Sequence, residues 1–156
     1  MGDEYLEYLR EKKDAREKKM KIYNELSEKR VEMDFMEMLV MLDSHNMNHW
    51  WLRECIETAL GMYKGDESKK GIYLSSENSN FGNPDTILTE ECWTEEKDGE
   101  MSVSFALTVY DLEGAERYLS EEGIEFLKKV GPSIFSRIVL NKESFKKIKK
   151  FYKDIF

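Results

Sequence analysis

The sequence is poor in cysteine and histidine, with two residues of each among 156. Cys55 and Cys92 are too few and too far apart for the disulfide framework that stabilises small secreted domains. Each lies in an apolar or strand-like segment, which fits a reducing compartment, so we expect a cytoplasmic protein. A chain of this length can bury the core of one domain without disulfides or metals. We therefore expect residues 1–156 to form a single domain.

Long apolar runs and phosphate-binding glycine motifs are also missing. No segment approaches the ~20 apolar residues that span a bilayer. The first residues, MGDEYLEYLREKK, are acidic where a secretory signal is basic. The patterns GxGxxG and GKS/T do not occur. We expect no membrane insertion, no secretory signal and no nucleotide-binding loop.

Most of the apolar residues lie in residues 31–63, which predict a helical hairpin. The first helix is expected from Val31, and one of its faces collects Met33, Met36 and Val40 beside a second apolar face. A helix that is apolar over much of its circumference is normally buried on several sides. Short polar side chains at residues 43–48 interrupt the pattern, and a second helix is expected from about Met47 to Tyr63.

Residues 3–30 predict a long, exposed helix that forms an N-terminal arm. Pairs in which an acidic residue precedes a basic residue by four positions stabilise such a helix by only ~0.2–0.5 kcal/mol each. Their sum is too small to keep an isolated helix folded. Its sparse apolar positions, Leu9, Met20, Tyr23 and Leu26, therefore need another surface. A second copy of the chain is one candidate, which makes a homodimer one of the expected partners.

The second half of the chain changes to strand periodicity. Residues 72–74 predict a short strand, residues 75–85 a loop, and residues 86–95 a second strand. Asp98-Gly99 predicts a hairpin turn before the best strand, whose inward residues are Met101, Val103, Phe105, Leu107 and Val109. A two-residue turn puts Leu88, Glu90, Cys92, Thr94 and Glu96 on that inward face, whereas a three-residue loop puts Ile87, Thr89, Glu91, Trp93 and Glu95 there. The sequence leaves both registers open.

The remaining segments complete the predicted fold. A helical region is expected over residues 112–130 with a break at Gly123, then a strand over residues 134–140, and a last helix capped by Asn141. The sequence thus predicts an α+β protein. It has a long N-terminal helix and a helical hairpin, followed by a small antiparallel sheet of about four strands covered by helices.

Acidic residues are concentrated in the middle of the chain. The net charge is −8, and it divides into +1 for residues 1–30, −16 for residues 31–126 and +7 for residues 127–156. A field of one sign attracts basic partners and raises their association rates. A basic nucleic-acid-binding protein is therefore the expected partner, and direct binding of nucleic acid by this acidic chain is disfavoured.

Carboxylates along the hairpin could form a row spaced much like the phosphates of a nucleic-acid strand. This row predicts a non-catalytic acidic inhibitor or nucleic-acid mimic, with no cofactor. Such inhibitors are frequent among phage and mobile-element anti-defence proteins, including anti-CRISPR proteins. The partner-binding residues expected on this hypothesis are the acids and two aromatic anchors, Glu90, Glu91, Trp93, Glu95, Glu96, Asp98, Glu100 and Phe81.

Two alternatives remain open from the sequence. A metal-dependent enzyme could use His45 and His49, which are four residues apart. It could instead use a nuclease-like set, Asp85, Glu95 and Lys97, although about ten residues of strand would separate the two acids by ~33 Å. The second alternative is nucleic-acid binding through the last helix, which carries Lys146, Lys147, Lys149, Lys150 and Lys153.

Overall fold

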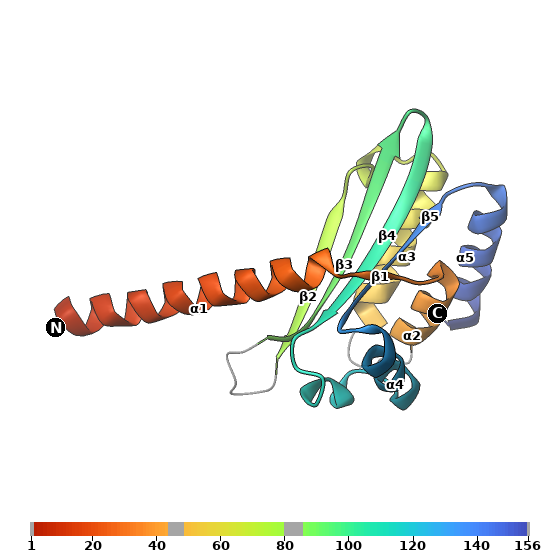
Figure 1. The fold of residues 1–156 in the computed structure, drawn as a ribbon. Coiled ribbons are helices and arrows are strands. Elements are labelled where there is room, and N and C mark those ends of the chain that lie inside the picture. The colour runs from red at the N-terminus through yellow and green to blue at the C-terminus, as the bar shows by residue number, and fades with distance from the viewer. Residues whose placement is uncertain (1, 44–48, 80–85, 156) are drawn as a thin grey trace.

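The computed structural model describes residues 2–43, 49–79 and 86–155, and it confirms an α+β protein. Helices and strands follow one another as Figure 1 shows. The helices are α1 (Gly2–Glu28), α2 (Phe35–Asp43), α3 (His49–Tyr63), α4 (Glu121–Val130) and α5 (Lys142–Ile155), with short 3-10 helices η1 (Glu67–Lys69) and η2 (Gly114–Arg117). The strands are β1 (Val31–Glu32), β2 (Tyr73–Ser79), β3 (Thr86–Lys97), β4 (Glu100–Val109) and β5 (Ser133–Val139).

The strands form one mixed sheet in the order β1-β5-β4-β3-β2. Strands β2 to β5 are an antiparallel meander, and β1 adds a parallel edge next to β5 through Val31 and Glu32. The described sheet therefore has five strands, one more than predicted. The sequence had placed Val31 in a helix, but α2 begins at Phe35 because the Asp34 carboxylate accepts hydrogen bonds from the amides of Met36 and Glu37.

The β3–β4 hairpin has the two-residue turn. Lys97 pairs with Glu100, and both turn residues have positive φ, 54° at Asp98 and 81° at Gly99. Positive φ at both positions is the signature of a type I′ turn, whose twist matches that of the flanking strands. This register puts Leu88, Cys92 and their neighbours on the face of Phe105, as the first of the two predicted alternatives requires.

The core lies between one face of the sheet and the helices α2, α3 and α5, which gather on the same side in Figure 1. Phe105 of β4 is at its centre, with ring centroids 5.3 Å from Phe35 and 5.9 Å from Trp51. Helix α5 adds Ile148, and the Phe145 ring stacks on Tyr63 at 4.5 Å. The predicted helical hairpin is thus present as α2 and α3, while residues 44–48 between them lie outside the described part.

Two predicted boundaries are wrong and one cap is confirmed. Strand β2 continues to Ser79, where a loop was expected, because pairing with β3 holds this polar segment extended. The third helical region breaks at Ser120 and not at Gly123, since the Ser120 hydroxyl accepts from the Gly123 amide at 3.1 Å and starts α4 there. Asn141 caps α5 as expected, with Oδ1 2.9 Å from the Ser144 amide.

Helix α1 projects from the sheet as a nearly free rod (Figure 1). It has 27 residues, all of them described, and none is buried. Its C-terminal end crosses the sheet on the face opposite α3, where Tyr23 and Leu26 are half-buried. The exposed N-terminal arm that the sequence predicted is therefore present.

Among the described helices, none combines the length and the apolar character that a membrane crossing requires.

Candidate binding groove

The first two acids of the predicted carboxylate row are buried. Glu90 is 1% exposed and Glu91 is 3% exposed, and they lie on opposite faces of β3. Burial removes both side chains from the partner-binding row, so this part of the prediction is wrong. The reason is that both faces of β3 are covered, one by the core and the other by the end of α1.

Glu91 holds α1 against the sheet. Its carboxylate accepts hydrogen bonds from the hydroxyls of Tyr23, at 2.7 Å, and Tyr73, at 2.6 Å. It also forms a 2.9 Å ion pair with Arg30, which follows α1. Partial burial and the hydrogen bond to Glu91 raise the pKa of Tyr73 above its ordinary value, although 60% of the residue's surface is exposed. Glu91 is thus an internal structural group rather than a recognition residue.

Glu90 faces the core beside the two cysteines. Cys92 is two residues further along the same face of β3, and Cys55 of α3 lies against it. Burial, followed by the hydrogen bond to Cys92, raises the pKa of the Cys55 thiol. Both thiols are free and buried, which suits packing and not chemistry with solvent.

The exposed acids of the predicted row lie at the turn end of the β3–β4 hairpin. Lys and Arg side chains form ion pairs with two of them. Glu96 pairs with Lys70 at 2.7 Å, and Glu100 pairs with Arg137 at 3.0 Å. The half-buried Trp93 donates its indole N–H to Glu95 at 2.9 Å. Asp98 is exposed in the turn. Phe81 lies outside the described residues.

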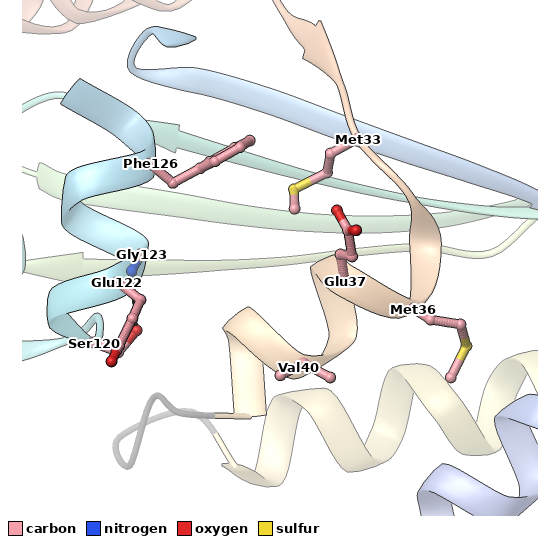
Figure 2. Close-up of a pocket in the computed structure, with 8 residues that line it drawn as sticks. All are labelled: Met33, Met36, Glu37, Val40, Ser120, Glu122, Gly123 and Phe126. Carbon is pink, nitrogen blue, oxygen red and sulfur yellow. Dashed lines mark hydrogen bonds between the residues drawn. The ribbon is translucent and has the colours of Figure 1, made fainter. Parts of the chain in front are cut away.

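A surface that combines apolar and acidic side chains lies between α2 and α4. Here a groove of about 490 Å³ is lined by Met33, Met36, Glu37, Val40, Ser120, Glu122, Gly123 and Phe126. Figure 2 shows Met33 and Phe126 extending toward each other, with Glu37 and Val40 on α2 across from Ser120 and Glu122 on α4. Val40 lines the groove and is 60% exposed.

Helix capping and helix periodicity build this groove. The Asp34 cap starts α2 so that Met36 and Val40 fall on one side, while Met38 and Leu39 enter the core. Met33 lies just before the cap, where its amide donates to the Phe135 carbonyl of β5. The Ser120 cap starts α4 so that Ile124 and Leu127 are buried. The other flank of α4, with Phe126, remains available to the groove. The sequence pattern had revealed the second apolar face of α2, but had assigned it to the interior.

The charged residues that line the groove are both acidic. They are Glu37 and Glu122, and both are exposed. Other exposed acids of η2 and α4, namely Glu116, Glu121 and Glu125, line a separate pocket together with Lys128. Lys128 is the basic neighbour that pairs with Glu125, at 3.3 Å. The arrangement is an apolar floor with an acidic rim.

The residues of the enzyme alternatives do not assemble in the described part of the chain. His45 and Asp85 lie outside it, and so does the His49 side chain. Within the described ranges, no group of three or more His, Cys, Asp or Glu residues could hold a metal. Strand β3 runs without interruption from Thr86 to Lys97, so Glu95 lies near the opposite end from the residue that follows Asp85.

The lysines of the last helix are exposed on α5, as its amphipathic pattern predicts. Lys147 pairs with Glu143 at 3.5 Å, and the Lys149 ammonium lies 5.8 Å from the centre of the Phe145 ring. Nucleic-acid binding through this helix stays a prediction.

No family model, no curated protein and no solved structure matches this chain.

Proposed function

We propose that this protein is a non-catalytic binding protein whose α2–α4 groove receives a basic amphipathic helix of another protein. The observation that carries the proposal is the groove itself, with an apolar floor of Met33, Met36, Val40 and Phe126 between two exposed glutamates. Laying the apolar face of a helix into such a groove is a common mode of peptide recognition.

The floor suits a helical ligand because methionine is unbranched and adapts to different shapes. Methionine-rich surfaces recur in proteins that bind amphipathic helices. Two methionines and an exposed Val40 offer apolar contact, and the Phe126 ring supplies a rigid wall. Burying apolar surface contributes roughly 25 cal/mol per Å² before the costs of association.

The rim determines the charge of the ligand. A helix flanked by Lys and Arg would meet Glu37 and Glu122 on either side, and Glu116, Glu121 and Glu125 nearby would steer its approach. An acidic helix would be repelled. Lys and Arg clustered on one face or along a helix are typical of nucleic-acid-binding proteins. We therefore propose such a protein as the partner, and inhibition by occupying its basic segment as the consequence of binding.

The first test uses a fluorescein-labelled synthetic peptide of about 18 residues, with Leu at i, i+3, i+4 and i+7 and Lys elsewhere. The purified full chain should bind it in fluorescence polarisation, and the affinity should fall as salt is raised. Val40→Asp puts a charge on the groove floor and Glu122→Lys reverses the rim. Each variant should raise the Kd at least about tenfold.

Matched controls separate the groove from the hairpin. Glu95→Lys changes the same kind of charge at an exposed hairpin position and should leave the Kd within about twofold. A peptide of the same composition but scrambled order should bind weakly. Equal binding to the Val40→Asp variant, or preference for the scrambled peptide, would overturn the groove as the site.

The natural partner is then sought by comparing three baits in a nuclease-treated lysate. A protein retained by the wild type and by Glu95→Lys, and lost with Val40→Asp, is a groove ligand. The proposal requires that this ligand be basic, that salt release it, and that it lose nucleic-acid binding when the protein is added. A ligand lost only with the hairpin variant would return the function to the carboxylate row.

A further inference from the structure

The N-terminal rod carries apolar side chains that its own chain leaves uncovered. From here on, the arm means residues 2–22 of α1, the part of the predicted N-terminal arm that precedes Tyr23. Residues 3–9 are its tip and residues 16–22 are its base. Six large hydrophobic residues of the arm are exposed, namely Tyr5, Leu6, Tyr8 and Leu9 at the tip and Met20 and Ile22 at the base. Tyr5 alone is 63% exposed.

Local interactions are too weak to maintain such a rod. The contacts with the sheet begin near its base, where Lys19 pairs with Glu77 at 2.8 Å and Tyr23 bonds to Glu91. The preceding residues form about four to five turns without a described tertiary contact to bury them. In proteins, most of the stability of a helix comes from tertiary packing of one of its faces. The arm therefore needs a partner of its own.

The charges of the arm identify that partner. The tip contains Asp3, Glu4 and Glu7 and neither Lys nor Arg, so its net charge is −3. Residues 16–22, at the base of the arm, contain four Lys or Arg residues and one Glu, so their net charge is +3. When two arms lie antiparallel, the tip of each arm lies against the base of the other arm. Opposite charges then meet at both ends of the pair. Two parallel arms would bring like charges together at both ends, which is destabilising.

The apolar residues follow the same arrangement. Leu6 at the tip and Met20 at the base are 14 residues apart, nearly four full turns, and so lie close to one face of α1. In an antiparallel pair, the Leu6 side of one arm faces the Met20 side of the other. We propose that two copies of this chain associate through antiparallel pairing of their arms, with a two-fold axis near the middle of the arm.

The groove between α2 and α4 is a poorer site for the tip. Its lining charges are Glu37 and Glu122, and they would repel the acidic tip of a second copy. Arm pairing and ligand binding thus use separate surfaces, and the dimer does not rest on the proposed function. A variant that fails to bind the peptide probe, such as Val40→Asp, should still dimerise.

The decisive experiment exchanges the charges of the full chain. The tip variant Asp3→Lys/Glu4→Lys/Glu7→Lys changes the tip from −3 to +3, and the base variant Arg16→Glu/Lys18→Glu/Lys21→Glu changes the base from +3 to −3. Lys19 is kept because it pairs with Glu77. By light scattering, the wild type should reach twice the 18.5 kDa chain mass, each variant alone should dissociate at least about tenfold more readily, and their mixture should dimerise again.

Cysteine cross-linking tests the orientation, because the native thiols are buried. Leu6→Cys and Met20→Cys are placed in separate chains and mixed under mild oxidation. An antiparallel pair should give the mixed disulfide, while each variant alone should give little. Three outcomes would overturn the proposal. In light scattering, they are a wild type that is monomeric at ~100 µM and a dimer that the charge exchange leaves unaffected. In cross-linking, it is a Leu6→Cys chain that links to itself while the mixed disulfide does not form.

Discussion

Arg30 and Glu91 join the N-terminal rod to the middle of the sheet, with Arg30 Nη2 2.9 Å from Glu91 Oε1. The side chain of Glu91 is 4% exposed and that of Arg30 is 17% exposed. The same carboxylate accepts from Tyr23 and Tyr73, so one buried group satisfies three donors from two distant segments. The direction in which α1 leaves the body depends on this cluster.

Glu91→Ala should strongly destabilise the fold, because it leaves the largely buried Arg30 guanidinium without its carboxylate. Removing one partner of a buried ion pair costs about 3–5 kcal/mol. Urea denaturation should report that decrease in the free energy of unfolding. Glu100→Ala, which removes an exposed ion pair with Arg137, is the matched control and should cost about 0–1 kcal/mol. Equal effects would contradict the structural role of Glu91.

Tyr73 should make the stability of the fold depend on alkaline pH. Burial and the hydrogen bond to Glu91 raise its folded-state pKa. The unfolded chain loses this proton near pH 10, so above that pH the unfolded state binds fewer protons and stability falls. The stability difference between the wild type and Tyr73→Phe should therefore be constant below about pH 10 and shrink as pH rises above it toward the raised folded-state pKa. A difference that stays constant in denaturation curves would refute this.

Gly99 should tolerate substitution poorly because its φ is 81° in the β3–β4 turn. Gly99→Val forces a β-branched side chain into the left-handed region, at a cost of about 1–2 kcal/mol. Thermal unfolding should show a decrease in Tm of roughly 2–4 °C per kcal/mol for a chain of this size. Asp98→Asn, at a neighbouring position with φ of 54°, keeps a residue that adopts this conformation and should leave the Tm nearly unchanged. The opposite order would contradict the type I′ turn.

Cys55 and Cys92 should not react with Ellman's reagent in the native protein, because both are buried and burial raises the pKa of Cys55. Both should react when the chain is unfolded in guanidinium chloride. Glu95→Cys, which places a thiol at an exposed position of the β3–β4 hairpin, is the positive control for the reagent. Native labelling of the wild type at the rate of that control would show that the core around Glu90 opens readily.

The sequence by itself determined the parts of the fold that depend on local rules. Alternating apolar residues predicted β4, Asp98-Gly99 predicted the hairpin, and Asn141 predicted the start of α5. Charge and hydrophobicity along residues 3–30 predicted an exposed rod. These features follow from the period of a helix or strand and from caps and turns, which involve residues close together in the chain.

Only the tertiary structure decided which surfaces are open. Glu90 and Glu91 looked like neighbours in an exposed row, but the core covers Glu90 and the end of α1 covers Glu91. Arg30, which pairs with Glu91, lies 61 residues before it in the chain. The apolar residues Met33, Met36 and Val40 looked like interior, yet the placement of α4 leaves them as the floor of a groove. The two-residue strand β1 exists only because β5 lies beside it. Local periodicity gives a residue its face, whereas packing between distant segments determines what covers that face.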